Sequence, residues 1–386
     1  MLTNGKSKEA ELNLSASTPT RLFELEDHAD LGKTSMKAIV QDKYGSPDVL
    51  ELREIDKPVV TDDEVLVRVH AASVHPDVWH VVRGWPYALR LMGAGLLKPK
   101  NSVPGTDVAG HVESVGKNVT QFQPGDEVFG ETSRQWQWHN GGAYAEYVSV
   151  PEEQLALKPA NITFEQAAAV PSSGFIALSG LRHQGQVRPG QKVLINGAGG
   201  GVGALAVQLA KAYGAEVTGV DSTRKLDMVR SLGADQVIDY TQEDFTQSGE
   251  RYDLILDVPG NHSLSECRRA LTPEGTYVLI GHDHFGVSGG RWLGSLPRFF
   301  KLVVMSPFVS QLPDRSRDTP RPKAHTRAAT TKPTSSPWPP RMRQRDPQHC
   351  HHHDALARAR PPEARVILTS IARGSERCHH VLLTPL

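Results

Sequence analysis

The chain has 386 residues, with 43 basic and 43 acidic side chains and a hydrophobic content of 38%. At roughly 100–200 residues per domain, this length predicts two domains. The zero net charge argues against a dedicated nucleic-acid-binding protein. The three cysteines lack the spacing of a zinc site or a disulfide framework, and neither a signal peptide nor a membrane span is visible. We therefore expect a cytoplasmic protein.

Residues 1–35 are polar, carry both charges and lack hydrophobic periodicity, which predicts a disordered extension. From residue 36 to residue 160, short strand-like segments alternate with Gly and Pro turn signals, which predicts a β-rich, partly open barrel. These segments are MKAIV, VLELREI, EVLVRVHAASV, GHVESVG, DEVFG and AYAEYVSV.

In residues 161–312, helical and strand patterns alternate. Helices are expected at 162–168, 173–181, 202–213, 222–232 and 264–271, and strands in KVLING, EVTGVD, QVIDY, YDLILDV and TYVLIG. Strands that alternate with helices predict an α/β fold with a parallel, doubly wound sheet of the Rossmann type.

The last part of the chain, residues 313–386, has a different composition. Residues 314–386 contain 14 Lys and Arg, 6 Asp and Glu, 10 Pro and no Phe or Tyr. Proline at this density blocks helices and strands alike, so we predict a disordered tail. A basic interaction tail is one interpretation. We favour the other, a GC-rich coding region read out of frame, which typically yields Arg, Pro, His, Thr and Ala.

The strongest motif is Asn196-Gly-Ala-Gly-Gly-Gly-Val-Gly203, which follows a predicted strand and opens a predicted helix. In this context one glycine makes the turn, one lets the backbone approach a pyrophosphate, and one lets helix and strand pack closely. The helix N-terminus adds free N–H groups and a positive dipole end. The motif predicts NADPH or NADH bound at Gly197, Gly199, Gly200, Gly201, Val202 and Gly203.

The residues that follow the next strand give a mixed signal on cofactor choice. Asp221 lies 18 residues after Gly203 and can accept hydrogen bonds from an adenosine ribose, which favours NAD. Ser222, Arg224 and Lys225 follow at once and can bind a 2′-phosphate, which favours NADP. Because two exposed cations outweigh one anion modestly, we expect loose selectivity with some preference for NADPH.

Together these residues resemble the medium-chain dehydrogenase/reductase family, and in particular its zinc-independent, quinone-oxidoreductase-like branch. The resemblance covers residues 36–311 and rests on VPGTDVAGHVESVG, QPGDEVFG, GGAYAEYVSVP, AAAVPSSG, NGAGGGVG, GADQVIDY and YDLILDVPG. It implies a GroES-like domain over residues 36–160, a Rossmann domain over residues 161–312 and an active site between them. It also implies that Lys225 and Tyr240 lie beside the adenosine phosphate and that Val258 lines the nicotinamide.

The resemblance also bears on zinc. Zinc-dependent members of the family need a Cys near AASV, a His-Glu pair after the PG turn, and a Cys or acid near AAAVPSSG; a catalytic zinc takes three protein ligands. This chain has His75, Thr106-Asp107 and Pro171-Ser172-Ser173 at those places. Although His75, Asp77 and His80 are close in sequence, histidine near a cleft is more often a polar lining residue. We expect no metal.

Without a Lewis acid, the expected chemistry is hydride delivery to an already activated acceptor, a quinone or an α,β-unsaturated carbonyl. His75 stands where similar enzymes have an Asn facing the nicotinamide, and Tyr87 lies in the loop GWPY. Each is a candidate to bind the substrate oxygen or donate a proton, against a packing role. The alternatives are a zinc-independent alcohol dehydrogenase, an enoyl-reductase-like enzyme, or a nucleotide-binding remnant without catalysis. A homodimer is the expected assembly.

Overall fold

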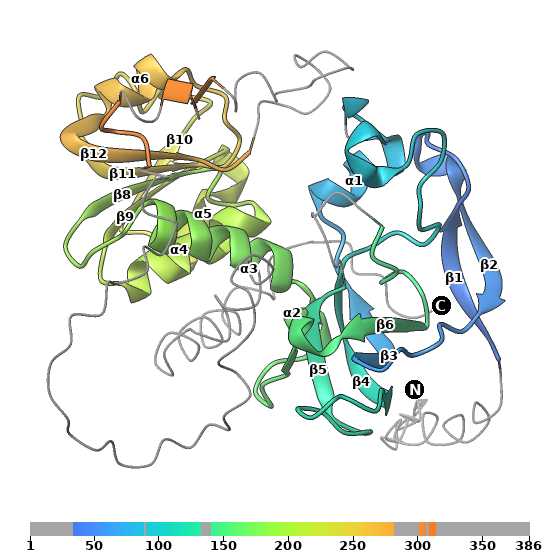
Figure 1. The fold of residues 1–386 in the computed structure, drawn as a ribbon. Helices are drawn as coiled ribbons and strands as arrows, with labels where there is room; N and C mark the ends of the chain where they lie inside the picture. Colours follow the sequence, from blue (N-terminus) through green and yellow to red (C-terminus); the bar gives the residue numbers. More distant parts are fainter. Residues whose placement is uncertain are drawn as a thin grey trace, which may run out of the picture.

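The computed structural model describes residues 34–88, 90–132, 140–281, 301–302, 304–305 and 309–313. Two lobes lie side by side, the first with strands β1 to β7 and the second with strands β8 to β12 (Figure 1). The predicted extension as far as residue 33 and the predicted tail from residue 314 lie outside the described residues. The domain boundaries therefore stay predictions, while both kinds of lobe are as predicted.

The first lobe is built on an antiparallel sheet of five strands in the order β6-β3-β4-β5-β7, and β1 pairs with β2 in a separate ladder. Along β3, Val65, Val67 and Val69 belong to one buried cluster, whereas Leu66 packs on the other face with Tyr147, as the period of two in a strand requires. The strands are β1 (Ser35–Gln41), β2 (Leu50–Asp56), β3 (Glu64–Ala72), β4 (Asp107–Val115), β5 (Glu127–Glu131), β6 (Tyr147–Pro151) and β7 (Leu155–Leu157).

Short helical segments connect these strands, and the sequence pattern did not predict them. The longest, α1, begins with Pro76 directly after the extended residue His75 and ends at Gly84, whose positive φ of 60° suits glycine. Eight residues are too few for a clear periodic signal. The segments are α1 (Pro76–Arg83), the 3-10 turns η1 (Pro47–Val49) and η3 (Glu152–Gln154), and the π-helical turn η2 (Arg90–Ala94).

The second lobe is a parallel sheet with the order β10-β9-β8-β11-β12. Two outward runs from the central strand β8 are the arrangement of a doubly wound Rossmann sheet, so that prediction is confirmed. The strands are β8 (Lys192–Asn196), β9 (Glu216–Asp221), β10 (Gln236–Asp239), β11 (Tyr252–Asp257) and β12 (Leu271–Leu279). The helices are α4 (Gly201–Ala212), the 3-10 turn η5 (Thr223–Lys225), α5 (Leu226–Ser231) and α6 (Leu264–Arg269).

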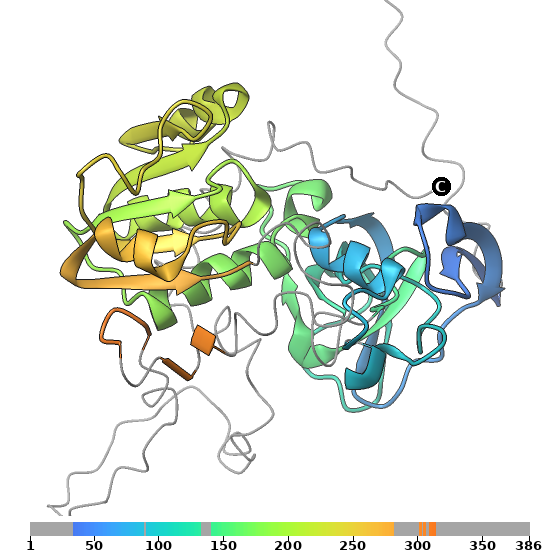
Figure 2. The same ribbon diagram turned by 90° about the horizontal axis from the view of Figure 1, so that it is seen from above.

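Three helical segments lead from one lobe to the other: α2 (Phe164–Ala168), α3 (Pro171–Leu178) and the π-helical η4 (Ser179–Gln184). They lie between the lobes in both views (Figures 1 and 2). Ala168 of α2 shares one buried cluster with Ala71 and Phe129 of the first lobe and with Val193 of the second. The apolar core is therefore continuous between the two sheets.

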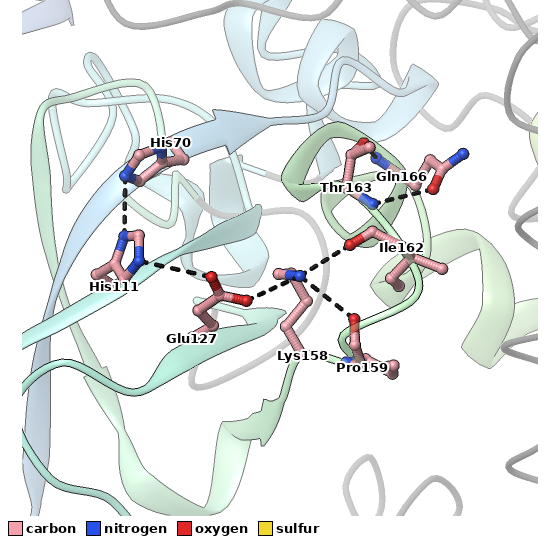
Figure 3. A network of polar contacts seen from close by, with 8 residues as sticks. All are labelled: His70, His111, Glu127, Lys158, Pro159, Ile162, Thr163 and Gln166. Carbon is pink, nitrogen blue, oxygen red and sulfur yellow. Dashed lines mark hydrogen bonds and ion pairs between the residues drawn. The ribbon is translucent and has the colours of Figure 1, made fainter. Parts of the chain in front are cut away.

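A polar network fixes the chain where it leaves the first lobe (Figure 3). The Lys158 side chain is only 5% exposed; its ammonium donates to the Ile162 carbonyl at 2.8 Å and lies 2.9 Å from Oε2 of Glu127. The hydrogen bond from Lys158 to Glu127 lowers the pKa of the Glu127 carboxyl. On the other side of Glu127, His111 Nδ1 lies 2.9 Å from His70 Nε2, and burial lowers the pKa of His70. Because α2 starts shortly after Ile162, the buried ammonium sets where the connecting helices begin.

The described chain stays attached to the second lobe as far as Leu312. The Tyr277 N–H donates to the Gln311 carbonyl at 2.8 Å, and the Gln311 amide donates to the Thr272 carbonyl at 3.0 Å. Leu312 is buried in an apolar cluster with Leu194 of the central strand. The last residues with a family-like sequence thus pack as part of the cofactor lobe.

Candidate functional site

The parallel sheet reverses its strand order between β8 and β11, and ligands bind at the carboxyl ends of strands at such a point. β8 ends at Asn196 and β11 at Asp257, which are register partners. The glycine loop follows the first and Val258 follows the second. Both predicted elements of the cofactor site therefore lie at this switch point.

A buried network holds these two strand ends together. The Asn196 amide donates to Oδ1 of Asp257 at 2.9 Å, and the Tyr277 hydroxyl donates to its Oδ2 at 2.8 Å. The Gly260 N–H also donates to Oδ1, so the loop after Val258 is tied to the same carboxylate. Sequence reasoning missed Asp257, although an acidic residue that closes the apolar run YDLILD was a visible signal.

In the glycine loop, the backbone N–H groups of residues 197–200 have acceptors within the protein. Those of Gly197 and Ala198 both donate to the Val220 carbonyl, at 2.9 and 3.0 Å, and that of Gly200 donates back to the Gly197 carbonyl at 3.1 Å. The Gly199 N–H donates to Oδ2 of Asp221 at 2.7 Å. In the described part of the chain, the N–H groups of residues 201–203 have no acceptor. They are the first amides of α4, which no helix can satisfy internally.

Three glycines of the loop differ in their backbone conformation and in the space around them. Gly197 has a φ of 80°, which favours glycine. A Cβ on Gly203 would lie 2.1 Å from the Gly197 carbonyl oxygen, so only glycine lets α4 start this close to β8. A Cβ on Gly200 would meet nothing nearer than that same oxygen at 3.4 Å. The face of the loop at Gly200 is therefore open, beside three free N–H groups and the positive end of a twelve-residue helix, which fits a diphosphate.

The remaining predicted cofactor residues lie along the same edge of the sheet. Asp221 ends β9 and is buried, Ser222 follows it, and Arg224 and Lys225 are exposed in η5. Tyr240 comes directly after β10 and is 58% exposed, with its N–H donating to the Asp221 carbonyl at 3.2 Å. The structure thus brings every predicted cofactor residue to the carboxyl ends of β8, β9, β10 and β11.

Asp107, a buried residue of the first lobe, accepts hydrogen bonds from α3, the helix that leads to the second lobe. Asp107 accepts the Ser172 hydroxyl at 2.6 Å, the Ser172 N–H at 3.2 Å and the Ser73 hydroxyl at 3.1 Å. Ser172 belongs to the first turn of α3, and a Cβ on Gly174 in the same helix would lie 3.8 Å from the Leu205 side chain of α4. Asp107 therefore connects the barrel to α3, which packs on α4.

His75 lies beside this carboxylate and is buried. Its Nε2 is 2.7 Å from the Thr106 hydroxyl, and its Nδ1 is 3.6 Å from a carboxylate oxygen of Asp77. Thr106 directly precedes Asp107. The hydrogen bond at Nε2 fixes the orientation of the imidazole, whereas 3.6 Å is too long for a hydrogen bond at Nδ1, so that nitrogen can bind a substrate oxygen or move a proton.

The two predicted catalytic residues do not form a pair. His75 precedes α1, whereas Tyr87 comes after its end, and eight helical residues span about 12 Å. The Tyr87 ring lies 4.7 Å from the Arg90 guanidinium, which also covers Tyr44 at 4.2 Å. The geometry therefore favours His75 over Tyr87 as the residue nearest the junction between the lobes.

Glu131 is a titratable group that sequence reasoning missed. It ends β5 and is the register partner of Asp107, with its side chain half-buried. Burial, together with the negative charges of Asp107 and Asp77, raises the pKa of Glu131 to about 8. Glu131 and Asp107 are adjacent because β4 pairs with β5. This pairing cannot be read from local sequence.

Within the described residues, no group of three His, Cys, Asp or Glu side chains is placed to hold a metal ion. The positions that correspond to the family's zinc ligands are close in space, but they hydrogen-bond in pairs: His75 with Thr106, and Asp107 with Ser172. In the same described part of the chain, no helix is both long and apolar enough to cross a membrane.

A barrel lobe joined to a Rossmann lobe, with a phosphate cradle at the switch point, defines a two-domain nucleotide-dependent dehydrogenase or reductase. Two family models match: "Alcohol dehydrogenase GroES-like domain" over residues 61–160 and "Zinc-binding dehydrogenase" over residues 201–295. The chain belongs to the medium-chain dehydrogenase/reductase family and is quinone oxidoreductase-like.

Three relatives illustrate the similarity. The chloroplastic NADPH-dependent alkenal/one oxidoreductase of Arabidopsis thaliana is 39% identical over 64% of this chain and 64% of its own length. The 2-methylene-furan-3-one reductase of Solanum lycopersicum is 37% identical over 72% of each. The Homo sapiens quinone oxidoreductase is 33% identical over 65% of this chain and 74% of its own. Among solved structures, the quinone oxidoreductase from Coxiella burnetii aligns with a TM-score of 0.57 at 32% identity, over 63% of this chain and 74% of its own.

The two glycines at the start of α4 are expected to respond differently to valine. Gly200→Val should leave the protein folded but abolish nucleotide binding, because its side chain points into the open phosphate face. Gly203→Val should lower stability by about 1–3 kcal/mol or more, because its side chain meets the Gly197 carbonyl. Thermal melts and calorimetric titration with NADPH measure both effects. Ala212→Val, exposed at the far end of α4, is the control; a folded Gly200→Val with unchanged affinity would contradict the phosphate site.

The raised pKa of Glu131 predicts a pH-dependent loss of stability. Since its pKa in the folded protein is about 8 and its ordinary value is 4.5, its contribution is complete below the ordinary value and is lost as the pH rises through about 8. Glu131→Gln should therefore gain stability over the natural protein between about pH 6 and about pH 9 in denaturant titrations. Glu153→Gln, an exposed glutamate, serves as the control. A pH-independent difference for Glu131→Gln would rule out the charge repulsion.

Proposed function

We propose that this protein uses NADPH or NADH to reduce quinones or α,β-unsaturated carbonyl compounds. The observation that carries the proposal is the cradle at Gly200, with three unpaired N–H groups at the start of α4. The names of the three relatives specify a quinone, an alkenal or alkenone, or a methylene-furanone as the compound reduced or oxidised. These compounds share a carbonyl in conjugation, which accepts hydride at carbon without further activation.

The residues of this chain divide the work between the lobes. When bound, the nicotinamide cofactor supplies the hydride. The N–H groups of Gly201, Val202 and Gly203 would hold its diphosphate, and Val258, directly after β11, would line the nicotinamide. His75, held by Thr106, donates a hydrogen bond to the substrate oxygen, where negative charge develops as hydride arrives at carbon. The Asp107–Ser172 bonds keep the two lobes in register for this contact.

We further propose that the reaction needs no zinc. At the family's ligand positions, His75 is a usual zinc ligand, but Thr106 and Ser172 are neutral hydroxyls, which are poor ones. The one carboxylate there, Asp107, already accepts three hydrogen bonds, whereas a catalytic zinc takes three protein ligands. A conjugated acceptor has no need of a Lewis acid. We also propose that the protein is cytoplasmic and forms a homodimer; the mechanism depends on neither.

Reductase activity tests the proposed function. The purified protein should oxidise NADPH or NADH in the presence of an ortho-quinone or 3-penten-2-one, and should not reduce a saturated ketone at a comparable rate. His75→Ala should lower kcat/KM by roughly 100-fold or more, as removal of a hydrogen-bond donor to a developing oxyanion does, while His75→Asn, which keeps such a donor, retains most of it. His183→Ala, an exposed histidine on η4, is the control. Nucleotide binding without turnover of any conjugated acceptor would instead favour a binding protein without catalysis.

Elemental analysis tests the metal proposal. The purified protein is expected to contain well below one zinc per chain, and treatment with a chelator should leave both reductase activity and the melting temperature unchanged. Stoichiometric zinc that is lost from His75→Ala, together with activity restored by added zinc after chelation, would overturn the proposal.

A further inference from the structure

Two histidines of the first lobe face each other beside the start of α2 (Figure 3). His70 is the extra residue of a bulge in β3, because the residues on either side of it pair with two consecutive residues of β4. His111 lies on β4, and its Nδ1 is 2.9 Å from Nε2 of His70. One of these nitrogens donates to the other, so the hydrogen bond requires that at least one of them carries no proton.

The two imidazoles hold the first residue of α2. The Phe164 ring stacks on His70, with the ring centroids 4.4 Å apart and the planes 19° from parallel, and its centroid lies 5.0 Å from that of His111. Four residues later, Ala168 ends α2 inside the apolar core that is continuous between the two sheets. The histidine pair therefore supports the first turn of the connection between the lobes.

Few negative charges are available to balance protons on this pair. Oε1 of Glu127 lies 3.7 Å from Nε2 of His111, but Oε2 of the same carboxylate lies 2.9 Å from the Lys158 ammonium. That ammonium is also 4.9 Å from the centroid of the Phe164 ring. A single carboxylate thus already faces one cation, and it adjoins only one of the two imidazoles.

The pair can take up one proton without losing its hydrogen bond, but it cannot take up two. With one extra proton, the imidazolium of one histidine donates to the neutral ring of the other, and such a charge-assisted hydrogen bond is stronger than a neutral one. With two, neither facing nitrogen can accept, and two positive rings would meet across 2.9 Å. The rings must then move apart, and Phe164 loses the support of at least one of them.

The surroundings of His70 oppose a proton on this ring. Burial, followed by the positive charges of His111 and of Arg68 on β3, lowers the pKa of His70 below its ordinary value of 6.5. The negative charges of Glu165 on α2 and of Glu127 on β5 offset this only in part. Because the unfolded chain binds this proton more readily, the stability contributed by a neutral His70 is complete above about pH 6.5 and is lost as the pH falls below that value.

We propose that His70 and His111 form a proton-sensitive latch, which accepts one proton but not two, and that the second proton releases the start of α2 from the barrel and loosens the link between the lobes. The latch involves neither nucleotide nor substrate, so it is independent of the proposed reductase activity. Its consequence is a reversible loosening in acid that is confined to the connection between the lobes and leaves the centre of the Rossmann sheet intact.

Two measurements on the full chain test the latch. In an NMR titration of the imidazoles, the pair should take up its protons in two steps separated by about one pH unit or more. In hydrogen exchange, corrected for the intrinsic effect of pH, the peptide 163–169 that contains α2 should exchange about tenfold faster at about pH 5 than at about pH 7.5, as expected for the loss of a hydrogen bond. The peptide 252–257, which is the inner strand β11, should not change.

The variant His70→Phe separates the titration from the packing. It keeps an aromatic ring against Phe164 but cannot take up a proton, so the faster exchange of α2 in acid should disappear. His183→Phe, which changes an exposed histidine on η4, is the matched control and should retain it. Uptake of both protons in one step, acceleration that persists in His70→Phe, or equal acceleration in β11 would each overturn the latch. If His70→Phe does not fold, the number of titration steps in the natural protein decides.

Discussion

The nucleotide site depends on one close contact, between the start of α4 and the carbonyl of Gly197. A Cβ on Gly203 would stand 2.1 Å from that oxygen, so no other residue lets the helix begin at this distance from β8. Because the helix begins there, its first amides lie at the switch point of the sheet, where the loop after β11 also arrives. The proposed binding of a diphosphate depends on this approach.

Three buried aspartates connect the backbone segments of the two lobes; Asp221 and Asp257 end their strands, and Asp107 begins β4. Asp257 ties the ends of β8 and β11, Asp221 binds the glycine loop, and Asp107 joins the barrel to α3. In each case the carboxylate accepts two or more hydrogen bonds within the protein, which offsets the free energy of burying it. These side chains therefore use much of their hydrogen-bonding capacity within the protein, whereas the first N–H groups of α4 have no acceptor among the described residues.

The sequence was sufficient for the parts of the fold that have a local signature. The strands of both lobes except the three-residue β7, the helix at 202–213 and the glycine loop follow from periodicity and from the glycine spacing, and the structure has them within a few residues. What local sequence could not predict depends on register. Glu131 and Asp107 are adjacent because β4 pairs with β5. The register of that pairing cannot be read from the sequence of the segment between the two strands.

Asp221 shows the same limit in another form. Its distance from the glycine motif correctly predicted that it would lie at the cofactor edge of the sheet, but spacing carries no information on which way a carboxylate turns. In the structure, the Gly199 N–H, 22 positions earlier in the chain, donates to one of the two oxygens of Asp221. A sequence motif fixes the location of a residue more firmly than its partner.

The raised pKa of Glu131 finally bears on how the barrel receives a substrate. At neutral pH, a pKa of about 8 keeps this carboxyl mostly protonated, so that Asp107 and Asp77 do not face a third negative charge. Reduction of a conjugated carbonyl places negative charge on the oxygen, which the proposed mechanism directs to His75, next to Asp77 and Thr106. An ionised Glu131 would oppose that charge through the same low-dielectric surroundings that raise its pKa. The protonated carboxyl therefore adds no third negative charge to the part of the barrel that holds Asp77 and Asp107.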